Sequence, residues 1–215
     1  MKKNMKRYLL VILGFMITGS GCALTMKANV GVGAWDALAK STNDLTGIAV
    51  GTAGMFFNCS CVVGQILILR NNFKPIQILQ IPLSILLGII VNFVLYNLLV
   101  FPFDSFIGGC FLYLLGSTIC AFGVSMVMLL DEITFALEGF CMALTNLLPF
   151  KFSSIRQAVD VICIIILVIV KFALQLPWSI GAGTIIGMLT FGPMLGIFMK
   201  LLKPVLKKQG VLNYD

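Results

Sequence analysis

The chain has 215 residues, of which 60% are hydrophobic and only 11% charged, and its formal net charge is +7. A soluble domain is usually about one quarter charged, so this apolar surface exceeds what a water-soluble core of this size can bury. The composition therefore argues against a soluble domain and predicts helices in contact with membrane lipid. The basic residues gather near both chain ends and in one short turn, which indicates membrane topology and not nucleic-acid binding.

Six stretches reach the length of about 20 apolar residues that a helix needs to cross a bilayer. The first resembles a signal peptide, but we interpret it as an uncleaved helix because five more spans follow it. Pro75 is well placed to begin the third span after the turn RNNFKP. The expected spans cover residues 8–28, 49–69, 76–100, 106–130, 155–174 and 179–200.

The distribution of Lys and Arg predicts the orientation of these spans. With the N-terminus inside, all strong basic clusters fall on the inner side: MKKNMKR, Arg70 with Lys74, Lys151 with Arg156, and the C-terminal lysines. An excess of Lys and Arg is typical of cytoplasmic loops. The sequence therefore predicts a multi-pass membrane protein with both termini cytoplasmic.

Two links between spans, residues 29–48 and 131–153, are longer than the others and contain apolar helical patches. Each could form an interfacial helix or a re-entrant half-helix, because irregular backbone at membrane depth needs protein or a water-filled cavity around it. In the second link, Asp131 and Glu132 are expected to face solvent.

An internal repeat relates the two links. Shifting the chain by 102 residues places residues 13–38 on 115–140, so that Asp36 falls on Glu138. The matching order of elements predicts a 3+3 repeat, with residues 1–104 and 105–215 as its halves within one membrane domain. Because three is an odd number of spans, the halves must be inverted relative to each other.

Inverted repeats are common in secondary transporters, which bind substrate near the bilayer midplane where broken helices meet. Asp36 and Glu138 would approach that point from opposite faces. For Asp36, an alternative is a surface ion pair with Lys40, and Glu138 could simply belong to the polar face of an inner amphipathic helix. The candidate substrate-binding residues are Trp35, Asp36, Lys40, Asn58, Glu138, Arg156 and Asp160.

Arg156 and Asp160 are four residues apart at the start of the fifth span. Because Arg stays protonated in proteins, Arg156 needs a carboxylate partner inside lipid. The pair is interpreted either as a helix-end ion pair or as an intracellular gate. Asn58, which the repeat places on Asp160, must bond across a helix interface or face a cavity.

Several chemistries have no support in the sequence. The chain has no histidine, and its seven cysteines lie mostly within apolar runs without the spacing of metal ligands. We therefore expect no metal, no cofactor and no enzymatic activity, although acid–base chemistry on Asp36, Glu138 or Asp160 is a third reading. Glycines four residues apart are typical of closely packed membrane helices. They are Gly47 and Gly51, Gly183 and Gly187, and Gly192 and Gly196.

Three motifs resemble the YczE/YyaS/YitT-like family of bacterial integral membrane proteins: GSGCALTMKANVGVGAWDAL, TGIAVGTAG at 46–54, and IGAGTIIGMLTFGPMLGIF at 180–198. The resemblance covers nearly the whole chain, but Ala34 stands where the family usually has proline. It implies a five- or six-helix inner-membrane protein, often described as a permease, without an established substrate.

Two functions follow as hypotheses. The first is a transporter or permease for an unidentified small solute, with its site between two inverted halves. The second is a non-transporting membrane subunit, either a substrate-binding component that needs an energising partner or a regulator of a larger complex. A homodimer formed through the glycine faces is a further alternative. The spans are expected to contact membrane lipid.

Overall fold

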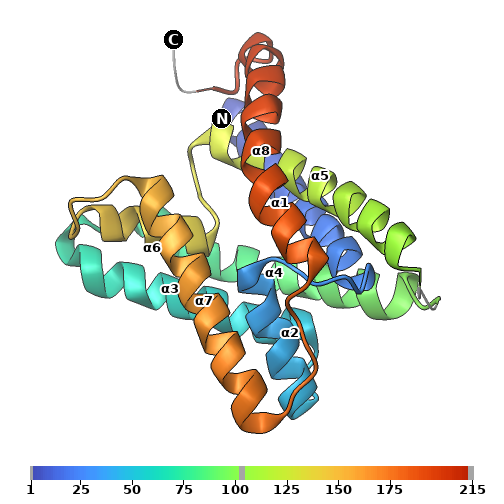
Figure 1. The fold of residues 1–215 in the computed structure, drawn as a ribbon. Coiled ribbons are helices and arrows are strands. Elements are labelled where there is room, and N and C mark those ends of the chain that lie inside the picture. Colours follow the sequence, from blue (N-terminus) through green and yellow to red (C-terminus); the bar gives the residue numbers. More distant parts are fainter. Residues whose placement is uncertain (1, 102–104, 213–215) are drawn as a thin grey trace.

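The computed structural model describes residues 2–101 and 105–212, and this part of the chain is helical without a strand (Figure 1). Six helices are long and apolar enough to cross a membrane, which confirms the predicted all-α, six-span class. Short helical turns at Arg70–Asn72 and Pro75–Leu79 precede α4, and Val94–Leu98 extends it. The helices are α1 (Lys2–Lys27), α2 (Ala34–Thr46), α3 (Val50–Leu69), α4 (Gln80–Phe93), α5 (Phe106–Leu130), α6 (Ala136–Thr145), α7 (Phe152–Leu174) and α8 (Ala182–Lys208).

The six candidate spans lie close to the predicted ranges. The third begins at Pro75, as expected. Proline has no backbone N–H group, but at the first helical position that group would have no partner within the helix. The sixth span continues as far as Lys208, well beyond the predicted end. Its last turn carries Lys207 and Lys208, whose charges suit the negative end of a helix dipole.

The two predicted links each contain a short helix. The 13 residues of α2 and the 10 residues of α6 would extend about 20 and 15 Å, too short for a hydrocarbon core of roughly 30 Å. Each buries alanines in the bundle, including Ala37 of α2 and Ala143 of α6. This burial favours half-helices that insert into the protein over helices that lie on its surface.

Three of the four pairs of equivalent helices begin 102 residues apart. The starts of α2 and α6 are residues 34 and 136, those of α3 and α7 are 50 and 152, and those of α4 and α8 are 80 and 182. The same offset relates residues 13–38 to residues 115–140 in the sequence. The helix order therefore has the periodicity that a repeat requires, while the division into residues 1–104 and 105–215 stays a prediction.

The central crossing of α1 and α5 has paired contacts. A Cβ atom added to Gly21 would lie 2.7 Å from the carbonyl oxygen of Gly116, and one added to Gly123 would lie 2.8 Å from that of Gly14. Only glycine lets two helix backbones approach so closely. Because Gly14 and Gly116, and Gly21 and Gly123, are each 102 residues apart, the two contacts are equivalent. Such reciprocal contacts are what a two-fold axis produces.

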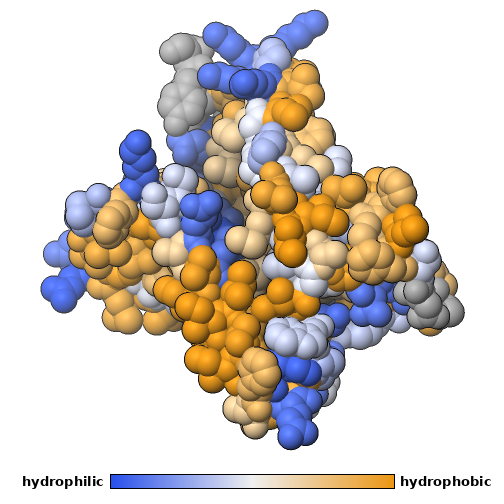
Figure 2. Space-filling view, in the orientation of Figure 1, coloured by the Kyte–Doolittle hydropathy of each residue, from blue (hydrophilic) through white to orange (hydrophobic). Residues whose placement is uncertain are grey.

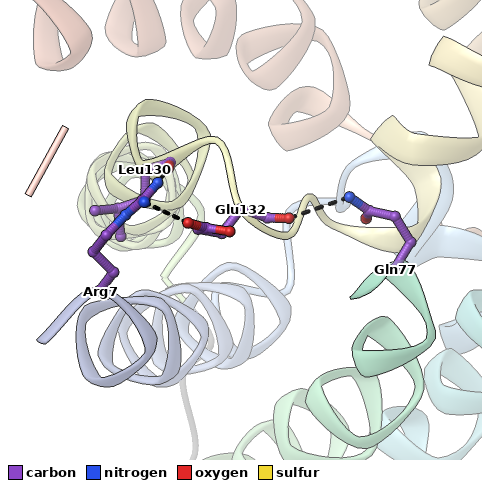
Figure 3. Close-up of polar contacts among 4 residues, drawn as sticks. All are labelled: Arg7, Gln77, Leu130 and Glu132. Carbon is purple, nitrogen blue, oxygen red and sulfur yellow. Dashed lines mark hydrogen bonds and ion pairs between the residues drawn. The ribbon is translucent and has the colours of Figure 1, made fainter. Parts of the chain in front are cut away.

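A buried arginine connects the two helices at one end of this crossing (Figure 3). Arg7 of α1 is 4% exposed, forms an ion pair with Glu132 and donates a hydrogen bond of 2.7 Å to the carbonyl oxygen of Leu130. The side chain of Gln77 donates to the backbone oxygen of Glu132 at 3.2 Å. Of the two acids expected to face solvent, Asp131 is exposed, whereas Glu132 is only 24% exposed because a cation from the other half of the chain reaches it.

The glycine pairs have different roles. Gly47 was expected on a helix face with Gly51, but this was wrong: Gly47 has φ 75° and caps the end of α2. Gly51 packs against the backbone of Gly88, where an added Cβ would lie 2.2 Å from the carbonyl oxygen. A Cβ at Gly192 or Gly196 would meet no atom within 4 Å, so this face of α8 is open in the chain described here.

The outer surface is apolar over the spans. Figure 2 shows hydrophobic side chains over α7 and hydrophilic ones at the end where α1 starts and α8 finishes. Figure 1 shows both termini at this same end. The apolar helices would contact lipid, as expected for a multi-pass membrane protein.

Candidate substrate-binding cavity

A cavity of about 210 Å³ lies where the two halves meet, and residues from all eight helices line it. Most of its wall is apolar, but it also contains charged groups and hydroxyls. Concave, mostly apolar sites with few polar groups are typical of small-molecule binding. The charged residues that line it are Asp36, Glu138, Arg156 and Asp160.

Glycines bring the start of α2 to this cavity. Gly31 has φ 94°, a conformation that glycine adopts without strain, and its Cα lies against the backbone of Gly181. The amide of Val32 donates to the oxygen of Ser179 at 3.2 Å, and Thr184 donates to the oxygen of Val32 at 2.6 Å. The link is thus fixed to α8, so that the first turn of α2 borders the cavity.

Asp36 lies in that first turn and lines the cavity. It forms no ion pair with any residue that the structure describes, whereas Lys40, on the same helix, does not line the cavity. Burial raises the pKa of Asp36 to about 6, against the opposing effect of the positive charge on Arg156. Asp36 is therefore a carboxylate without a cation of its own, on a half-helix outside the six spans.

Glu138 occupies the equivalent first turn of α6, in the other half. Arg156 of α7 lies between two carboxylates: its Nε is 3.8 Å from Glu138 Oε1, and its guanidinium pairs with Asp160. The predicted Arg156–Asp160 pair is thus formed, one helical turn apart and beside the cavity. Three carboxylates and one guanidinium share this site.

Trp35 and Asn58 form a second group on the wall. The indole Nε1 of Trp35 donates to Asn58 Oδ1 at 3.3 Å, and its ring meets Phe57 edge-on with 6.0 Å between centroids. These contacts hold the indole at the cavity edge. Of the seven candidate residues, the structure therefore gathers six around one cavity and places Lys40 outside it.

Three hydroxyl groups on the cavity wall were not predicted. Ser84, Ser117 and Tyr113 are 2%, 3% and 3% exposed and line the cavity. None of them has a hydrogen-bond partner among the residues that the structure describes. Gly183 and Gly187 of α8 make room for the ring of Tyr113: a Cβ at Gly187 would lie 2.2 Å from its hydroxyl oxygen.

Metal binding gains no support from the described residues. They contain no group of three His, Cys, Asp or Glu side chains that could hold a metal ion. The two cysteines that line the cavity, Cys22 and Cys120, have their sulfur atoms 3.7 Å apart and form no disulfide.

Six apolar helices around a cavity with ionisable side chains define a polytopic α-helical membrane protein. Residues 5–200 match a family of unknown function (DUF6198), and the chain belongs to that family. No curated protein and no solved structure matches the chain. The description of this family names no substrate.

Proposed function

We propose that the protein transports a small solute across the bacterial plasma membrane, with one central site between two inverted halves. One observation carries the proposal: the first turns of α2 and α6, one from each half, bring Asp36 and Glu138 to the same cavity. Half-helices that meet at a central site are the recurring arrangement of secondary transporters. Ionisable residues at membrane depth are costly and usually mark transport pathways.

The reciprocal α1–α5 crossing supports an alternating-access mechanism. A near two-fold relation lets the two halves exchange their packing around a fixed site, so that it opens to one side and then the other. We propose that the cavity binds and releases its solute without covalent chemistry. The charge distribution supports cytoplasmic termini, and the quoted motifs support kinship with the YczE/YyaS/YitT-like proteins.

The test is flux through purified protein. Proteoliposomes are loaded with a mixture of small metabolites, and the solutes that leave are identified by mass spectrometry against protein-free vesicles. We expect protein-dependent release of one solute class, which Asp36→Asn, Glu138→Gln and the double variant reduce at least tenfold. Asp44→Asn, an exposed carboxylate change on the same helix, is the matched control. Retention of every solute, or flux that ignores both substitutions, contradicts the proposal.

A second candidate function is a substrate-binding membrane subunit that needs a partner. Its support is the open face of α8 at Gly192 and Gly196, since small residues on a helix face commonly admit another helix. Gentle purification from the native membrane would then yield a stoichiometric partner, and flux would require it. Full flux by the protein alone contradicts this alternative, and a homodimer would appear as twice the protein mass.

A further inference from the structure

The charges that border the cavity do not balance. Its lining contains three acidic residues and one basic residue, which leaves a formal charge of −2 when all are ionised. Arg156 already interacts with Glu138 and Asp160, while Asp36 has no ion pair in the described chain. Charge in a low-dielectric site is expensive unless it is compensated. The cavity is therefore electrostatically incomplete, and a cation would complete it.

The helix ends at the cavity point to the same sign of charge. The N-terminus of a helix carries partial positive charge and ordinarily attracts an anion. Here the chain supplies the anions itself, since Asp36 and Glu138 lie in the first turns of α2 and α6. An anionic ligand would have to displace these carboxylates or lie beside them. The two positions that an anionic substrate would use are thus already taken.

The three unpaired hydroxyls give an independent indication of a ligand. Ser84, Ser117 and Tyr113 come from α4 and α5, are almost fully buried as residues, and line the cavity without a partner in the described chain. Their oxygens face the cavity space and not the packed core, so a ligand in the cavity can reach them. An N–H donor that enters the cavity would find three oxygen acceptors, and the rings of Trp35 and Tyr113 would favour a cation.

We propose that this cavity binds a small organic ammonium ion, with its positive nitrogen paired to Asp36 and its N–H groups donated to the wall hydroxyls. The proposal names the substrate class of the transport site and rests on the proposed function only for its translocation, not for its binding. An organic cation fits better than a divalent metal because the described residues offer no three-ligand group. The volume of about 210 Å³ is below the roughly 300–1,000 Å³ of drug-sized sites, so the ligand is small.

The chain provides its own reporter for the test. It has two tryptophans, Trp35 at the cavity and Trp178 outside it. In a Trp178→Phe background the fluorescence reports on Trp35 alone. Protein in nanodiscs at pH 7.5 is titrated with n-alkylammonium ions from methyl to hexyl, and with the matched alcohols and carboxylates. We expect saturable binding of at least one ammonium ion, and affinities at least tenfold lower for the matched alcohol and carboxylate.

Two variants locate the binding. Asp36→Asn should weaken ammonium binding at least tenfold, while Asp44→Asn, exposed on the same helix, should leave it within twofold. Saturable carboxylate binding, no response to any ammonium ion, or equal affinity in Asp36→Asn overturns the proposal. The flux assay separates the two claims: binding without flux contradicts transport alone, and flux of an anion or a neutral solute contradicts the cation alone.

Discussion

The two halves of the molecule share their helix order but differ in how their last two helices pack. In the first half α3 lies along α4, whereas the equivalent α7 and α8 barely touch each other (Figure 1). Gly51 and Gly88 allow the close contact in the first half. A shift of 102 residues puts Ser153 and Thr190 at these positions, where side chains prevent such an approach. The α3–α4 pair is therefore closely packed, whereas α7 packs on α2 and α6 and α8 packs on α5.

The charges follow the same division. The repeat relates Gly54 and Asn58 of α3 to Arg156 and Asp160 of α7, and all four line the cavity. The neutral pair lies on α3, in the closely packed helix pair, and the ion pair lies on α7. We expect α7 to be the element whose displacement changes access, because it carries the switchable electrostatic contacts and few packing contacts.

The two ends of the α1–α5 crossing differ as well. Removing the Arg7 contacts at one end should have the largest effect on stability. Arg7 and Glu132 correspond by the repeat to Gly109 and Val30, which pack closely at the opposite end. Arg7→Met would leave Glu132 and the Leu130 oxygen without their cation. Removing one partner of a buried pair typically costs about 3 kcal/mol or more. We expect that loss in the free energy of unfolding in mixed SDS micelles.

Lys6→Met is the control for that experiment, because Lys6 is an exposed neighbour of Arg7. It removes the same charge from the same helix end and should change stability by less than about 0.5 kcal/mol. Equal effects of the two substitutions would mean that net charge, and not the buried contact, matters.

The next effect concerns the packed and the loose helix pairs. Gly51→Val forces its Cβ into the Gly88 oxygen, which lies 2.2 Å from an ideal Cβ position. Overpacking of this kind costs typically 1–3 kcal/mol. The equivalent Ser153→Val, on an exposed position of α7, should be nearly neutral. Thermal unfolding of both variants measures the difference, and equal midpoints would show that the two halves pack alike.

Much of this structure could be predicted from the sequence, and the reason is lipid. Apolar runs of sufficient length identify spans because backbone groups in a bilayer must bond within a helix. The offset of 102 residues, and with it the equivalence of Asp36 and Glu138, could be predicted from matching residues and from the matching order of elements. The association of Arg7 with Glu132 could not, because hydropathy reports how apolar a helix is and not which way it faces. The cavity hydroxyls on α4 and α5 could not be predicted for the same reason.

The next smaller effect is expected in the pH dependence of stability, which distinguishes Asp36 from the other acids. Its pKa is raised from 3.8 in the unfolded chain to about 6 in the folded protein. Between these values the folded state binds more protons than the unfolded state, so the Asp36 contribution to stability falls as pH rises. Wild type relative to Asp36→Asn should therefore gain stability from pH 7 to pH 5.

The comparison between wild type and variant removes the contributions of the remaining carboxylates. Asp44→Asn, measured in the same way, should follow wild type, because Asp44 is exposed. Parallel pH profiles of wild type and Asp36→Asn would show that Asp36 is not desolvated. Ammonium affinity should show the same midpoint with the expected sign, weakening below about pH 6 as Asp36 is protonated.

The smallest effect is expected at Lys40, which separates the cavity from the rest of α2. Lys40 lies one turn beyond Asp36, yet it neither lines the cavity nor pairs with Asp36 in the structure. Lys40→Ala should therefore change ammonium affinity by less than twofold and stability by less than about 0.5 kcal/mol. If Lys40 instead neutralised Asp36, its removal would strengthen cation binding severalfold. Titration of Lys40→Ala beside Asp36→Asn thus tests directly whether the carboxylate is free to bind a ligand.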